Sequence, residues 1–140
     1  MPNTRFQQYL EAEVLGADPI KLVTMLYRGA LDAVTAARRS LGSGLVSERS
    51  RQITKAWEIV HELNRSLDSE QGGQLSRNLA ELYVYIQQRL LDANARQADE
   101  PLAEVEKLLA TLWEAWRGLT PAAVRTPVVA DVYEPVSCEA

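Results

Sequence analysis

Few residues in this sequence have the chemistry that catalysis or metal binding requires. The only histidine, His61, stands three positions after Glu58, and a Glu-x-x-His pair on a bundle helix is one part of a di-iron carboxylate site. Such a site needs a second histidine from another helix, and this chain has none. A histidine at the edge of an apolar helix stripe, hydrogen-bonded or half exposed, is therefore the better interpretation.

The other candidates for chemistry are also incomplete. Cys138 is the single cysteine and has no histidine near it in sequence, so nothing indicates the base and oxyanion site that a catalytic thiol requires. Gly72-Gly73 is not a phosphate loop, because no strand precedes it and no Gly-Lys-Ser/Thr follows it. Glu104 and Glu106 point to different helix faces. The sequence therefore indicates no enzyme, no metal site and no cofactor.

The composition is typical of an ordinary globular protein of the cytoplasm. A chain of 140 residues is long enough for one domain with a core, and its net charge of −4 argues against nucleic-acid binding, which usually needs a basic face. A single cysteine excludes an internal disulfide and suits a reducing cytoplasm. The sequence has no signal-peptide core and no run of ~20 apolar residues that could insert into a membrane. We therefore expect a cytoplasmic protein.

Apolar residues recur at helical spacing in four stretches of the sequence, and the helices that these stretches predict must hold any functional side chains in place. An acidic cap followed by proline marks the start of two of them. The predicted helices are 18–41, beginning at Asp18-Pro19; a second from a Ser47 cap to about Ser69; a third from about Gly73 to Ala95; and a fourth from Asp99-Glu100-Pro101 to about 117.

The connection predicted between the second and third helices is Gly72-Gly73, where positive φ has no steric cost. A connection this short makes the two helices antiparallel neighbours. Four such helices predict an all-α fold, an antiparallel four-helix bundle over residues 18–117 with crossing angles near ~20°. Residues 1–17 are either an arm that docks on the body or a frayed terminus, and residues 118–140, with several prolines, form an irregular tail.

The helices carry more large apolar residues than a four-helix core needs, since such a core takes about three positions per heptad. In one interpretation, these extra residues widen the core or lie singly on the surface. In the other, they form a groove for a partner, and each large side chain that the partner buries contributes ~1.5–3 kcal/mol to binding. The sequence alone leaves both interpretations open. The surplus residues are Leu22, Met25, Leu26, Ile59, Tyr83, Tyr85, Leu91, Leu108 and Trp113.

Several short motifs, in order along the chain, resemble the flagellin-export chaperone family, FliS. No single motif is specific for the family, but the whole set is. The motifs extend from about Tyr9 to Trp116. Arg28 and Val84 depart from the family pattern, which usually has acidic residues there. The motifs are Ala17-Asp18-Pro19, Met25-Leu26-Tyr27 with Gly29-Ala30, Leu67-Asp68, Glu70, Gly72-Gly73, Asn78-Leu79, Leu82-Tyr83, Tyr85, Arg89-Leu90 and Ala93-Asn94.

The resemblance implies a cytoplasmic chaperone, not an enzyme, that binds the disordered C-terminal segment of flagellin in apolar grooves. It implies that binding prevents premature polymerisation, that the client is delivered to the export gate protein FlhA, and that the N-terminal arm caps part of the groove. A homodimer of the client-free chain is a further partner to test. The candidate groove or cap residues are Tyr9, Leu22, Met25, Leu26, Ile59, Leu63, Leu79, Leu82, Tyr83, Tyr85 and Ile86.

Two other functions compete with this one. The same bundle would suit an adaptor or regulator that binds a folded flagellar protein through its surface. The state of the partner separates the two, because a clamp prefers an unfolded tail over a folded domain. A metal-binding enzyme ranks third, and metal analysis of the purified protein tests it.

Overall fold

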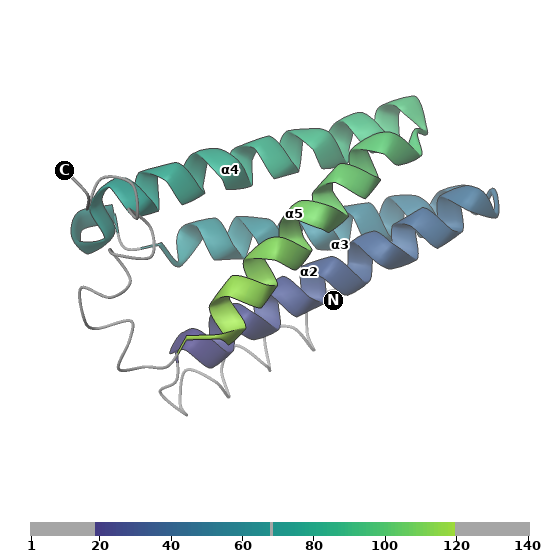
Figure 1. Ribbon diagram of the computed structural model, residues 1–140. Coiled ribbons are helices and arrows are strands. Elements are labelled where there is room, and N and C mark those ends of the chain that lie inside the picture. Colours follow the sequence, from purple (N-terminus) through teal and green to yellow (C-terminus); the bar gives the residue numbers. More distant parts are fainter. Residues whose placement is uncertain (1–18, 68, 120–140) are drawn as a thin grey trace.

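Four helices make up the described part of the chain, residues 19–67 and 69–119 of a computed structural model (Figure 1). They are α2 (Pro19–Gly42), α3 (Val46–Arg65), α4 (Ser69–Arg96) and α5 (Asp99–Arg117). Successive helices run in opposite directions, and each packs on two neighbours: α2 and α4 both contact α3 and α5 (Figure 1). The predicted antiparallel four-helix bundle is therefore confirmed, although Figure 1 shows α5 crossing α4 obliquely.

Aliphatic side chains from all four helices form one interior, together with Tyr27 and Tyr83. Small side chains also belong to this interior, since Ala30 and Ala37 of α2 and Ala56 of α3 are fully buried. These residues recur every three or four positions, so each helix turns one face inward, and their burial rather than helix propensity stabilises the bundle. The most deeply buried aliphatic residues are Val34, Ile53, Val60, Leu63, Ile86, Leu90, Leu102, Val105 and Leu109.

Two predicted helix caps are wrong. Helix α3 begins at Val46, after Leu45, and no side chain caps it, so Ser47 already lies inside the first turn. Helix α5 begins after the extended residue Ala98, and no side-chain cap bonds its first amides. The carboxylate of Asp99 instead binds Arg38 of α2, because an ion pair between helices competes for the same oxygen atoms.

The α3–α4 connection also differs from the prediction. Helix α3 ends at Arg65, where the Ser66 amide and hydroxyl bond back to the last turn, and helix α4 already begins at Ser69. Gly73 then interrupts α4 with φ 57° and ψ −131°, a conformation that essentially only glycine adopts. Gly73 thus kinks α4 after its first turn, so the positive φ predicted for the double glycine is confirmed at Gly73, whereas residues 66–68 connect α3 to α4.

Some predictions concern residues outside the described part of the chain. They are the arm over 1–17 with Tyr9, the Asp18 cap, and the tail over 118–140 apart from Gly118 and Leu119. Of the chain beside these segments, the structure describes the start of α2 and the end of α5, which lie at the same end of the bundle (Figure 1).

Candidate functional site

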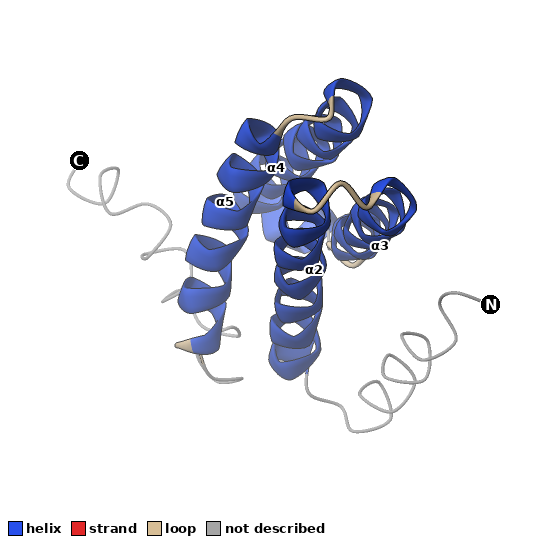
Figure 2. Ribbon diagram, turned by 90° about the vertical axis from the view of Figure 1, so that its right-hand side faces the viewer, coloured by secondary structure: helices blue, strands red, loops and turns tan. Residues whose placement is uncertain are grey.

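The two ends of the bundle present different side chains. The start of α2, the end of α3, the start of α4 and the end of α5 meet at one end, which we call the apolar end (Figure 1). The α2–α3 and α4–α5 connections lie at the other, which we call the polar end, and Figure 2 looks onto it. This division follows directly from the up-down order of the helices.

Large side chains that the interior covers only in part gather toward the apolar end. Leu22 and Met25 belong to the first turns of α2, and Leu79 belongs to the first half of α4. Because each retains apolar surface in water, each has burial energy left to gain from a partner. Other half-buried residues toward this end are Val23, Leu67, Leu75, Leu82, Leu112, Trp113 and Trp116.

Beneath this surface lies an aromatic cluster of the buried Tyr27 and Tyr83 and the half-buried Trp116. The hydroxyls of Tyr27 and Tyr83 are hydrogen-bonded to each other, and the Tyr27 ring packs on Trp116 with centroids 6.3 Å apart. Burial raises the pKa of Tyr27 well above its usual range and that of Tyr83 to about 12. Both phenols therefore stay neutral at physiological pH and satisfy each other, which leaves no activated base or nucleophile.

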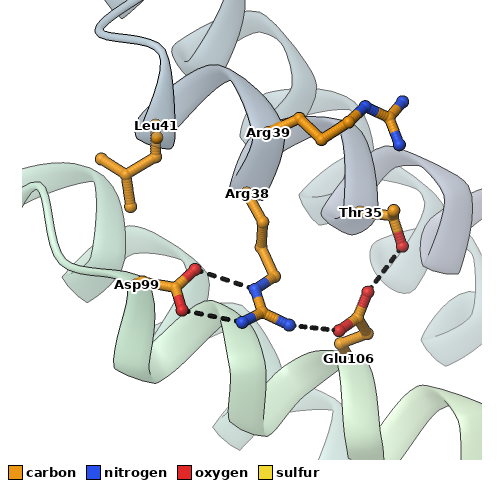
Figure 3. A pocket seen from close by; sticks show the side chains of 7 residues that line it. Thr35, Arg38, Arg39, Leu41, Asp99 and Glu106 are labelled. Carbon is orange, nitrogen blue, oxygen red and sulfur yellow. Dashed lines mark hydrogen bonds and ion pairs between the residues drawn. The ribbon is translucent and has the colours of Figure 1, made fainter.

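At the polar end, Arg38 of α2 bridges two carboxylates of α5 (Figure 3). Its Nε and Nη2 each donate to Asp99 at 2.8 Å, and its Nη1 donates to Glu106. The Thr35 hydroxyl donates to the same Glu106 at 2.7 Å. The hydrogen bonds from Arg38 lower the pKa of Asp99. These groups line an open depression but bind one another, so the arrangement fastens α2 to α5 and offers no reactive group.

A second polar network joins α4 to α5. Arg89 Nε donates to Glu104 at 2.7 Å, and the Tyr85 hydroxyl donates to the same carboxylate at 2.6 Å. These bonds, first that from Tyr85, lower the pKa of Glu104. Tyr85 is 41% exposed, yet its hydroxyl is committed to the neighbouring helix.

The structure divides the eleven candidate groove or cap residues into separate groups. Leu26, Ile59, Leu63, Tyr83 and Ile86 are at most 3% exposed and form part of the interior. They sit at the centre of the apolar stripes, where neighbouring helices cover them. Half-buried candidates toward the apolar end are Leu22, Met25, Leu79 and Leu82; Tyr85 is exposed, and Tyr9 lies outside the described residues.

The candidate set did not include an exposed apolar pair on α4. Val84 is 44% and Leu91 56% exposed, and both lie outside the helix face that the core residues Ile86 and Leu90 occupy. A helical wheel places them seven residues apart on one side, with Gln88 between them. Leu45 and Val46, both 55% exposed, form another such pair at the α2–α3 connection.

His61 is exposed and stacks on Trp57 one turn before it, with ring centroids 5.3 Å apart and an interplanar angle of 10°. Within residues 19–67 and 69–119, no three histidine, cysteine, aspartate or glutamate side chains gather closely enough to hold a metal ion. None of the described helices is long and apolar enough to cross a membrane. Cys138 lies outside the described residues.

Comparison with known proteins identifies the family. The family model described as flagellar protein FliS matches residues 1–123. The chain is 40% identical to the flagellar secretion chaperone FliS of Salmonella typhimurium over 118 residues, which cover 84% of this chain and 87% of that protein. It is 36% identical to the flagellar secretion chaperone FliSB of Pseudomonas aeruginosa over 117 residues, 83% of this chain and 93% of the relative. For the Bacillus subtilis FliS the identity is 31% over 116 residues, 83% of this chain and 84% of the relative. The chain belongs to the FliS family of flagellar secretion chaperones.

Proposed function

We propose that this chaperone binds the disordered C-terminal segment of flagellin along the half-buried apolar side chains toward the apolar end of its bundle. Binding keeps the segment from polymerising before export and delivers it to the export gate protein FlhA. The protein works by binding, without catalysis, and it does so in the cytoplasm. Family membership supports the chaperone role, and the arrangement of side chains supports the location of the surface.

The observation that carries the proposal is the incomplete burial of Leu22, Met25, Leu79 and Leu82. A disordered segment loses ~2–5 kcal/mol of free energy when it becomes ordered on binding. Each large apolar side chain that becomes fully buried returns ~1.5–3 kcal/mol, less for one already half covered. Several such contacts, together with apolar side chains of the client, are enough to offset the ordering cost.

The aromatic cluster beneath this surface suits it for a guest that arrives without structure. Tyr27 and Tyr83 are almost fully buried and hydrogen-bonded to each other, so their side chains form a rigid base under the surface. Met25 on the surface is unbranched and adapts to irregular partners. A rigid base under adaptable side chains favours a groove that accepts successive helical turns of a client.

The predicted arm fits the same proposal. Residues 1–17 precede α2 in the sequence, and the start of α2 lies at the apolar end. In the client-free chaperone, Tyr9 covers part of the groove and leaves when the client binds. We expect Tyr9→Ala to leave the stability of the bundle unchanged and to change client affinity. An unchanged dissociation constant would remove the capping role.

Calorimetric titration with a peptide from the C-terminal end of the cognate flagellin tests the function. We expect a dissociation constant of about 1 μM or below and a gain of helicity in circular dichroism. Absence of both heat and helicity change would contradict the proposal. Binding of folded flagellar proteins in place of the peptide would favour the adaptor.

A matched pair of variants tests the location. Met25→Glu places a charge in the proposed groove and should weaken peptide binding about tenfold or more. Leu45→Glu introduces the same charge at an exposed position of the polar end and should change affinity less than about twofold. Equal effects of the two variants, with urea denaturation showing both folded, would place the client elsewhere.

A further inference from the structure

We propose that the acidic C-terminal segment of this chain, residues 124–140, docks on the seam between α2 and α5 toward the apolar end of the bundle. Trp113 of α5 marks this seam, because two arginine side chains lie against its half-buried ring. The guanidinium carbon of Arg28, on α2, is 5.3 Å from the ring centroid, and that of Arg117, on α5, is 4.6 Å from it. We call Arg28, Trp113 and Arg117 the seam cluster.

The two arginines of the seam cluster keep N–H donors that no described residue takes. Arg28 donates to Asp32 through Nε alone, at 3.2 Å, and the Nη1 of Arg117 approaches Glu114 no closer than 3.5 Å. Both arginine side chains are more than half exposed. A guanidinium that lies against an aromatic ring still presents the N–H groups in its own plane, and these match the two oxygens of a carboxylate. The seam cluster is therefore built to bind carboxylates.

The C-terminal segment supplies such carboxylates. It contains Asp131, Glu134 and Glu139 and a single basic residue, Arg125. The match to the family model ends at residue 123, so the segment lies beyond the part of the chain that this model covers. Charge complementarity between the segment and the seam cluster favours contact between them.

The connection of the chain brings the segment to the seam. Leu119 follows Arg117 by two positions, at the end of the described part of α5 and its C-cap. Asp131 comes twelve residues later, and twelve extended residues span about 40 Å, so the chain has ample length to turn back to Trp113. Exposed ion pairs are weak singly. A short tether offsets this weakness, because it holds the segment at a millimolar effective concentration. Tyr133, which follows Asp131 by two positions, adds an aromatic ring that can cover the rest of Trp113.

A spin label tests the docking in the full chain. Cys138 is the single cysteine, so a nitroxide attached to it reports the position of the segment without any substitution. NMR then measures the paramagnetic relaxation of the indole N–H protons. We expect strong relaxation at Trp113 and little at Trp57, which belongs to α3, across α2 from α5 (Figure 2). Relaxation at Trp113 no stronger than at Trp57 would overturn the docking.

A matched pair of variants tests the role of the seam cluster. Arg28→Glu places a negative charge opposite the acidic segment and should lower the ratio of docked to free segment about fivefold or more. Arg65→Glu is the control, because Arg65 lies at the same end of the bundle and, like Arg28, is exposed and has one ion pair within its own helix. It should change the ratio less than about twofold. Equal effects of the two variants would overturn the assignment to the seam cluster.

Charge exchange tests the pairing. Arg28→Glu/Arg117→Glu should abolish the relaxation at Trp113, and adding Asp131→Arg/Glu134→Arg to it should restore most of the relaxation. A fourfold variant that stays undocked would overturn the pairing of these charges. So would a wild type without relaxation at Trp113 whose Arg28→Glu variant binds the flagellin peptide more weakly, because the seam cluster would then belong to the client. The docking itself does not depend on the proposed function.

Discussion

The two ends of this bundle differ in what holds them together. At the polar end, Arg38 and Arg89 bind carboxylates on neighbouring helices, so the polar groups are satisfied within the chain. Toward the apolar end, Leu22, Met25 and Leu79 are covered only in part. Polar groups that already have partners gain little from a guest, although Leu45 and Val46 are also exposed at that end. The half-covered apolar side chains toward the other end gain from each apolar contact that a guest makes. Under the proposed function, incomplete burial of apolar side chains, rather than unusual chemistry, marks the surface for the client.

The largest expected effect comes from the base of the apolar end. Tyr83→Ala removes a fully buried ring and leaves the Tyr27 hydroxyl without its partner, so it should reduce the free energy of unfolding by about 3–5 kcal/mol. Urea denaturation followed by circular dichroism measures this loss. A loss below about 1 kcal/mol would mean that the cluster is not a base for the surface above it.

The next effect appears at alkaline pH. The pKa of Tyr83 is about 12 in the folded chain and about 10 in the unfolded chain, and that of Tyr27 is raised further. The contribution of the two phenols to the free energy of unfolding is fully present below pH 10 and is lost as the pH rises toward 12. The reason is that the folded state still holds protons that the unfolded state releases. The expected slope is about 1.4 kcal/mol per pH unit for each phenol that ionises on unfolding.

The control for this slope is the double variant Tyr27→Phe/Tyr83→Phe, which has neither buried phenol. Unfolding measured at several pH values between 9 and 12 should show a slope in the wild type and a flatter line in the double variant. Equal slopes would show that other groups cause the alkaline loss.

The smallest effect concerns the polar end. Arg38→Ala removes both ion pairs to α5, but these groups are partly exposed, so the loss at neutral pH should be about 1 kcal/mol or less. The pKa of Asp99 is lowered by Arg38, so this contribution is present above the ordinary carboxyl pKa and is lost as the pH falls through the lowered value. The free energies of unfolding of the wild type and of Arg38→Ala should therefore become equal at acid pH. A loss as large as that of Tyr83→Ala would break the comparison between the ends.

The fold could be predicted from the sequence because the spacing of apolar residues within each helix is enough to identify that helix. The apolar spacing of Ile53, Val60 and Leu63 identifies one inward face, and the same rule applies to each helix. Capping was harder to predict, since Asp99 has the right chemistry for a cap but pairs with Arg38, 61 residues away in sequence. No short-range pattern reports such a contact.

The candidate surface could be predicted only in part. Periodicity shows that Ile59 and Met25 both belong to apolar faces, but not which of them a neighbouring helix covers. Ile59 comes within reach of Gly29 on α2 and is buried, whereas Met25, one turn before that glycine, keeps part of its surface. The width of each interhelical gap decides the difference, and that width depends on the packing of the whole bundle.

Gly72 and Gly73 are adjacent, yet a side chain at each position would meet a different obstacle. A β-carbon on Gly73 would meet no atom within 4 Å, so only the torsion angles exclude other residues there. A β-carbon on Gly72 would stand 1.7 Å from the Ser76 hydroxyl oxygen and 2.8 Å from Ser76 Cβ, so at this position the obstacle is occupied space. The two glycines therefore answer to separate causes: the backbone torsion angles at Gly73 and the side chain of Ser76 at Gly72.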